Sequence, residues 1–334
     1  MAGNINFTNY LKHYYRRNPL LITIMLRLEK ISKKIAHVLR RGATNLMRIF
    51  NSFQKTKNVD QLHAYSKFSI SLPAGHPLPI NQRQHKLYDR FLPHLAKHLN
   101  NADLVVDVGA NVGDTAASML DANPELEFIC IEPDDIFFSY LNKNAKTIRN
   151  NISNSKIDTL KQLVGKNITN VKLVGAIGSR HSVEISGKGL KSIQLDTILA
   201  GYLKKPRLIK CDVDGFDWDV LESASNTLQT GSTIIFFECE YTQLSQAARF
   251  KKIISSMSDY GYHHWRIFDN FGNFLLKTDD THQIFSLMNY VWRQNFGGSS
   301  RTIWYFDLLA CKIDEEAFLE AVVDKYCQQV DRLR

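Results

Sequence analysis

The sequence predicts an α/β protein whose core is a doubly wound, mostly parallel β-sheet with helices on both faces. Apolar runs of strand length alternate along the chain with segments whose apolar residues recur at helical spacing, as in repeated β–α units. The composition, 44% hydrophobic and 22% charged, suits a globular protein with a sizeable core. A glycine-containing turn, VGANVG, lies at the end of the strand-like run 104–108. In such folds, ligands bind at the turns that follow the strands.

Residues 1–60 predict a basic, amphipathic helical extension. They hold twelve Lys or Arg and two acids, whereas the whole chain carries a net charge of +9, so the remaining body is nearly neutral. An apolar stripe at helical spacing begins with Leu21, Ile24, Met25 and Leu28. The uninterrupted apolar run 20–26 is far shorter than the ~20 residues of a membrane span, and no small-residue cleavage site follows it.

Two interpretations of this extension remain open. It packs on the body or on a second copy in a homo-oligomer, or residues 19–50 lie on an anionic membrane surface. No recognisable nucleic-acid module accompanies the basic residues, so we expect no nucleic-acid partner. Cys130, Cys211 and Cys239 lie in strand-like runs, and we interpret them as buried free thiols of a cytoplasmic protein, with any membrane contact at the inner face.

Residues 61–100 are expected to form a helical lead-in to the sheet. His94 and His98 are spaced as metal ligands on a helix can be, but no glutamate follows His94 as in zinc proteases. We therefore interpret both as surface histidines.

The body from 101 to 334 is expected to alternate strands and helices. Strands are predicted at 104–108, 128–132, 171–177, 207–213 and 233–238, and helices at 115–120, 134–147, 216–228 and 243–260. Late strands are predicted within 263–277, with a turn at 270–273, and within 301–312, before a final helix at 314–333. The polar run 148–156 is expected to be a surface excursion.

The turn after the first of these strands does not match a dinucleotide fingerprint. Gly109 and Gly113 are four residues apart and Asn111 lies between them, which departs from G-x-G-x-x-G. Asp107 ends the strand, where it can accept hydrogen bonds from a ligand ammonium or from loop amides. Glu132 ends the next strand, 23 residues past Gly109, where an acid can accept the two hydroxyls of a ribose.

These motifs resemble the S-adenosylmethionine site of class I methyltransferases, and more closely the FkbM family of methyltransferases. The matching pieces, in order, are VVDVGANVGDTA, ICIEPD, VGAIG, SIQLDTIL, IKCDVDGFDWDVLESA and IIFFECE, which span roughly 100–240. The family commonly has D-V-E-G where this chain has Asp214 in D-V-D-G, so its carboxylate has a shorter reach. The resemblance implies a Rossmann-like class I methyltransferase domain over 101–334.

The resemblance also implies the cofactor and its contacts. S-adenosyl-L-methionine would be held at its methionine part by Asp107, Gly109, Asn111 and Gly113, and at its ribose by Glu132. Relatives often place an acid or amide for the adenine near the third strand, and VKLVGAIG, the predicted third strand, offers none.

Carboxylates gather after the fourth and fifth strands of the predicted sheet. Asp212 is our first choice for the base that removes a proton from an acceptor hydroxyl; Glu238 or Glu240 is the second, and Asp214 lies near the site. Asp217 is expected to start a helix, and Asp219 to be solvated. The spacing requires no metal, and we assign none, although Asp212, Asp214 and Glu238 could share a divalent cation.

The sequence thus predicts an O-methyltransferase acting on a hydroxyl of a sugar, glycan or other polyhydroxylated acceptor. One alternative is a metal-dependent glycosyltransferase that uses the Asp212/Asp214 D-x-D pair. Another is a non-catalytic, membrane-associated scaffold. His263 and His264 could line an acceptor pocket, but we expect one to pack and the other to be exposed.

Overall fold

The computed structural model describes residues 59–166, 169–174, 181–184, 189–296 and 303–332. The chain divides into two units, 1–59 and 60–334, and only the second is described below. The predicted basic helical extension, with its candidate contact segment 19–50, lies outside the described residues and stays a prediction. No helix within the described ranges is both long enough and apolar enough to cross a lipid bilayer.

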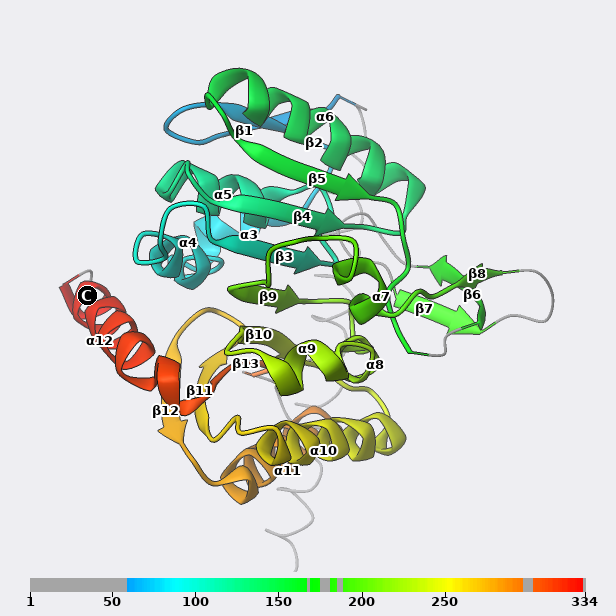
Figure 1. Ribbon diagram of the computed structural model, residues 1–334, viewed down its shortest axis with the longest axis vertical. Coiled ribbons are helices and arrows are strands. Elements are labelled where there is room, and N and C mark those ends of the chain that lie inside the picture. Colours follow the sequence, from blue (N-terminus) through cyan, green and yellow to red (C-terminus); the bar gives the residue numbers. More distant parts are fainter. Residues whose placement is uncertain (1–58, 167–168, 175–180, 185–188, 297–302, 333–334) are drawn as a thin grey trace, which may run out of the picture. The chain divides into compact units, whose positions relative to one another are not determined.

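The core of the body is an eight-stranded sheet, which confirms the predicted doubly wound α/β class (Figure 1). Its strands are, in spatial order, β5 (Lys156–Leu160), β4 (Glu127–Ile131), β3 (Leu104–Val108), β9 (Leu208–Cys211), β10 (Ile234–Cys239), β13 (Phe306–Cys311), β11 (His264–Asp269) and β12 (Phe274–Thr278). The first five run parallel, and β13 pairs antiparallel with both β10 and β11. Within this sheet the chain first forms β3, then adds β4 and β5 on one side of β3, and later adds β9 on the other side of β3. This places a topological switch point, where open α/β sheets bind ligands, between β3 and β9.

Helices cover both faces of the sheet because each central strand is apolar on both sides. All five residues of β3 are buried, and alternate positions join different cores: Val105 packs in one cluster and Val106 in the other. The first core includes residues of α4 (Phe91–Ala96), α5 (Asp114–Ala122), α6 (Asp135–Asn151) and α12 (Glu316–Arg332). The second includes residues of α7 (Leu195–Leu199), α8 (Asp217–Glu222), α9 (Ser225–Thr230), α10 (Leu244–Asp259) and α11 (Thr281–Phe296).

The third parallel strand is not the predicted one. β5 occupies that place, whereas β6 (Thr169–Val174), within the predicted strand 171–177, belongs to a separate antiparallel sheet with β7 (His181–Glu184) and β8 (Leu190–Lys191). The run 148–156, predicted to be a surface excursion, is mostly exposed as expected, but it contains the end of α6 and the first residue of β5. β5 was missed because it ends the sheet and is only partly buried, so it lacks the apolar run of a central strand.

The lead-in is less helical than expected. A hairpin of β1 (Gln61–Ala64) and β2 (Ser69–Leu72) precedes two short helices, α3 (Leu78–Gln84) and α4. Asn144 ties the hairpin to the body, since its buried amide accepts from Ser71 N–H (2.8 Å) and donates to the carbonyl oxygens of Ser71 (2.9 Å) and Val112 (2.8 Å). Elsewhere, the predicted helix 216–228 is divided into α8 and α9, and α11 was not predicted. A short 3₁₀ turn, Ile313–Glu315, precedes α12.

Two side-chain predictions have clear outcomes. The five cysteines are free thiols, and Cys130, Cys211 and Cys239 are buried as predicted. The interpretation of His94 as a surface residue is wrong: it is 5% exposed, and its ring bonds the carbonyl oxygen of Val322 (3.0 Å) and Oε1 of Gln329 (3.2 Å). These partners lie on α12, so His94 fastens α4 to that helix.

Candidate active site at the carboxyl edge of the sheet

The turn between β3 and α5 requires glycine for steric reasons. Gly109 has φ +79°, and a Cβ atom there would lie 1.9 Å from the carbonyl oxygen of Asp212. The turn after β3 therefore packs directly against the turn after β9. Gly113 caps α5 with φ +82°, and its Cβ would meet Cδ1 of Leu141 at 2.9 Å. Both glycines thus permit close packing of the turn against its neighbours.

Glu132 is held at the switch point by backbone amides. Its Oε2 accepts from the N–H of Asn111 (2.9 Å) and its Oε1 accepts from the N–H of Asp134 (2.8 Å). Asn111 donates from a left-handed backbone conformation, φ 49°. Burial raises the pKa of Glu132 to about 7, although these two amides oppose the shift. Each carboxylate oxygen keeps a further lone pair, so the fixed side chain can still accept hydroxyl donors.

A pocket opens beside this turn. It spans about 1100 Å³, its open mouth included, and Gly109, Asn111 and Glu132 line it. Its apolar walls come from Ile131, Phe137 and Val164, among others. A pocket with apolar walls and a few polar groups is the usual form of a small-molecule site.

The end of β5 contributes a residue that the sequence analysis missed. Gln162 lines the pocket two residues past Leu160, the last residue of β5. It offers the amide that was sought after the third strand. It was missed because the third strand had been placed at 171–177 instead of 156–160.

Lys210 is a second missed residue, and it connects two predicted ones. Its Nζ lies 3.1 Å from Oδ1 of Asp107 and 3.4 Å from Oδ2 of Asp212, and it donates to the carbonyl oxygen of Gly109 (3.3 Å). Burial raises the pKa of Asp107 and Lys210 opposes this. Burial lowers the pKa of Lys210, but Asp107 and Asp212 outweigh it and leave it above its usual value. The sequence did contain a signal for this pairing, a lysine inside the apolar strand run LIKC. A buried charge requires a counter-charge, so an acidic partner for Lys210 could have been expected.

The predicted methionine contacts are therefore placed at different depths. Gly109 and Asn111 line the pocket, whereas Asp107 is fully buried beneath the turn, paired with Lys210. Of the two roles considered for Asp107, its position favours ordering of the turn. Gly113 lies one turn further, at the start of α5.

A second cavity adjoins the first and is rich in carboxylates. It spans about 640 Å³, and Asp89, Glu238 and Asp307 line it. Asp212 and Lys210 line both cavities. The side chain of Asp212 is 49% exposed, so the residue predicted to be the base faces open space between the two cavities.

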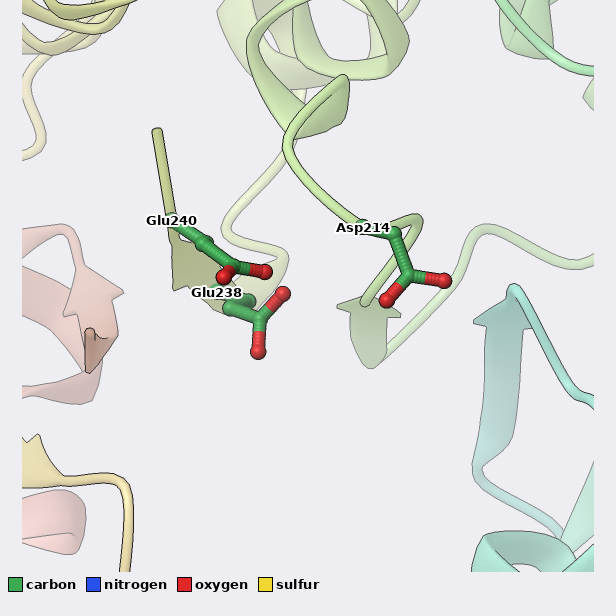
Figure 2. Close-up of side chains that lie close together, drawn as sticks. All are labelled: Asp214, Glu238 and Glu240. Carbon is green, nitrogen blue, oxygen red and sulfur yellow. The ribbon is translucent and has the colours of Figure 1, made fainter. Parts of the chain in front are cut away.

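The remaining predicted carboxylates divide into two groups. Asp214, Glu238 and Glu240 converge from the ends of β9 and β10, with carboxylate oxygens within 4.8 Å of one another (Figure 2). Asp217 begins α8, as expected, and is fully buried. Asp219, expected to be solvated, is instead buried and accepts from the N–H of Lys166 (2.8 Å), because α8 packs beneath that loop.

The two histidines do not belong to this site. β11 runs parallel to β10, since both pair antiparallel with β13, so His264 at the start of β11 lies at the opposite edge of the sheet. Its Nδ1 lies 3.2 Å from Oε2 of Glu316. His263 is exposed, which fits the expectation that one histidine packs and the other is exposed.

Comparison with known proteins identifies a family for this region. Residues 107–263 match the family model described as the methyltransferase FkbM domain. None of the curated proteins matches the sequence significantly.

Several solved structures show distant similarity. The methyltransferase FkbM from Methylobacillus flagellatus KT is 16% identical, with 63% of this chain and 43% of that chain covered and a TM-score of 0.39. An S-adenosylmethionine-dependent O-methyltransferase from Thermotoga maritima is 10% identical, with 67% and 64% covered and a TM-score of 0.37. The plantazolicin methyltransferase BamL, solved with S-adenosylhomocysteine, is 11% identical, with 70% and 85% covered and a TM-score of 0.38. At such low identities and TM-scores, the fold class follows from the strand order of the sheet alone.

Proposed function

We propose, because residues 107–263 match the model of the methyltransferase FkbM domain, that the protein transfers a methyl group from S-adenosyl-L-methionine to a hydroxyl of a sugar, glycan or other polyhydroxylated acceptor. The observation that carries the cofactor assignment is the fixed carboxylate of Glu132 beside the Gly109 turn, at the switch point of the sheet. An acid in this place can accept both ribose hydroxyls.

The other residues of the larger pocket fit the same cofactor. Gln162 can bond the edge of an adenine, and Ile131, Phe137 and Val164 offer apolar surface to its faces. Gly109 and Asn111 bring backbone close to the place of the methionine part.

The cofactor supplies a methyl group on sulfur, and as the acceptor oxygen bonds to that carbon the carbon–sulfur bond breaks with its electron pair left on sulfur. The protein must position the acceptor oxygen in line and accept its proton. Asp212 can accept this proton because it is half exposed between the cavities, and Lys210 at 3.4 Å orients it. Glu238 or Glu240 remains the second choice for the base, and Asp214 lies beside them.

The second cavity supports a polyhydroxylated acceptor. Asp89, Glu238 and Asp307 line it together with Tyr88 and Tyr305. Burial raises the pKa of each of these three carboxyl groups. A carboxyl group that keeps its proton both donates and accepts hydrogen bonds, so such a wall suits a ligand with many hydroxyls. The family match favours this activity over a glycosyltransferase or a scaffold. Neither of those functions would explain the carboxylate of Glu132 fixed beside the Gly109 turn.

Calorimetric titration with S-adenosylhomocysteine tests the cofactor assignment. The wild type and Glu125→Gln, which changes an exposed acid in the turn before β4, should bind it equally. Glu132→Ala should bind it ~10–100-fold more weakly, since a hydrogen bond to a charged group contributes ~1.5–3 kcal/mol. Absence of binding by the wild type would refute the assignment.

A product screen tests the acceptor class. Cell-extract glycans and small polyols would be incubated with the protein and with cofactor carrying a labelled methyl group. Label should appear on oxygen in a glycan or polyol fraction. Label found only on nitrogen or carbon would overturn the O-methylation proposal.

Peripheral membrane contact through residues 19–50 also remains a proposal, supported by the basic residues and apolar stripe of that segment. In the full chain, Lys33→Glu with Lys34→Glu should reduce binding to vesicles that contain anionic lipid. Unchanged binding, or no binding by the wild type, would reject the contact.

A further inference from the structure

Three carboxylates converge beside Asp212, the first choice for the catalytic base. Glu238 and Glu240 are two positions apart at the end of β10, so their side chains leave the same face of the strand. Asp214 approaches from the turn that follows β9, the neighbouring strand. One carboxylate oxygen from each lies within 4.8 Å of the others, and Figure 2 shows the three side chains turned toward a common space.

Glu238 provides an independent indication that this space holds a ligand. Its side chain is 6% exposed, and its buried Oε2 has no hydrogen-bond partner in the described part of the chain. Glu238 is the buried member of the cluster, whereas Asp214 and Glu240 are half-buried. A buried carboxylate beside two others is costly unless it is neutralised, and a bound cation is one way to neutralise it.

The dimensions and atom types select one class of cation. Two oxygens bound to a single ion at about 2.4 Å can be no more than about 4.8 Å apart, and Ca²⁺ and Mg²⁺ both prefer oxygen ligands. Within the described residues the cluster holds no sulfur or imidazole ligand, which disfavours zinc and copper. Three carboxylates leave coordination positions for water or a ligand hydroxyl.

We propose that Asp214, Glu238 and Glu240 form a binding site for a hard divalent cation that holds the acceptor of the methyl transfer. The role of the ion rests on the function proposed above, whereas the site itself does not. Asp214 lines the larger cavity and Glu238 the smaller one, so the ion lies where the two meet. Bound to the ion, an acceptor hydroxyl loses its proton more readily, and Asp212 is placed to receive it.

Calorimetry on the full chain tests the site directly. The protein is treated with a chelator, dialysed, and titrated separately with Mg²⁺, Mn²⁺ and Ca²⁺, and bound Mn²⁺ is also counted by electron paramagnetic resonance. The wild type should bind one ion. Glu238→Gln and Glu240→Gln, which keep side-chain shape, should each weaken binding by ~10-fold or more, as loss of a supporting group at a metal site does.

The matched control is Glu127→Gln, the same change at the start of β4, on the opposite edge of the sheet. It should bind the ion as the wild type does. No binding by the wild type at millimolar concentration, or equal binding by Glu238→Gln, Glu240→Gln and the control, overturns the cation site.

S-adenosylhomocysteine titrated into the same samples separates the two proposals. If it binds while no cation does, the cation site is wrong and the proposed function stands. If the cation binds with the expected variant pattern and S-adenosylhomocysteine does not, the site stands and the proposed function fails.

Discussion

Replacement of Gly109 by alanine should be among the most damaging single-methyl additions in this body. The left-handed conformation at φ +79° costs a residue with a Cβ about 1–2 kcal/mol. The new Cβ would also lie 1.9 Å from the carbonyl oxygen and 2.9 Å from the carbonyl carbon of Asp212. These atoms are backbone, so relief requires the turns after β3 and β9 to separate, which adds ~1–3 kcal/mol. We expect a total loss of about 2–5 kcal/mol in the free energy of unfolding.

Gly75→Ala is the matched control. Gly75 has nearly the same φ, +81°, but nothing lies within 4 Å of its Cβ position, so it should lose only the conformational ~1–2 kcal/mol. Gly113→Ala should fall between the two, since its contact is the flexible end of Leu141. Urea unfolding of the three variants measures these losses, and S-adenosylhomocysteine titration measures the pocket. Equal losses at Gly109 and Gly75 would refute the claim that the two turns are in forced contact.

Three further predictions concern charge and buried hydrogen bonds. The pKa of Glu132 is raised from 4.5 to about 7, so between these pH values Glu132 is protonated in the folded state and ionised in the unfolded state. The contribution of Glu132 to stability therefore falls as pH rises from about 4.5 to 7. S-adenosylhomocysteine should bind up to ~10-fold more tightly at pH 8 than at pH 6, and Glu132→Gln should remove this dependence; an unchanged pH profile would contradict the ribose role. Lys210→Met leaves the buried carboxylate of Asp107 without its counter-charge and should lower the free energy of unfolding by ~3–5 kcal/mol. Adding Asp107→Asn to this variant should recover part of that loss, measured by urea unfolding. Strictly additive losses from the two changes would argue against the pair. Asn144→Ala leaves buried backbone groups without partners and should lower unfolding free energy by ~2–4 kcal/mol, against less than ~1 kcal/mol for Asn142→Ala on the exposed face of the same helix; similar losses would count against the buried amide as a fastener.

The central part of the fold was predictable because its strands are buried on both faces. β3, β9 and β10 are short, mostly apolar runs with one charged residue each. The glycines after β3 indicate a turn with unusual backbone angles. Glu132 was found for a related reason, since the acid follows directly after the next such run. The strands predicted from the sequence match the observed ones where complete burial determines which residues a strand can contain.

The prediction failed where that demand is relaxed. β5, at the sheet edge, has only two apolar residues in KIDTL, whereas the segment of β6 is more apolar and was preferred as the third strand. Gln162 was lost with it. Lys210 could not be assigned a partner from sequence, because its pairing with Asp107 joins different strands and depends on their register. His94 and Asp219 were judged solvated because their partners, Val322 and Lys166, are distant in sequence.

The position of β13 has a consequence for how the protein is made. This strand follows β11 and β12 in the sequence, yet it lies between β10 and β11. Its residue Asp307 and the preceding Tyr305 line the smaller cavity. During synthesis, a growing chain would carry every cofactor-facing residue of β3, β4 and β9 while the sheet still had a gap in its interior. Since contacts between segments far apart in sequence form late and slowly, the smaller cavity should be among the last parts of the body to form, which would keep partly folded chains from binding a ligand there.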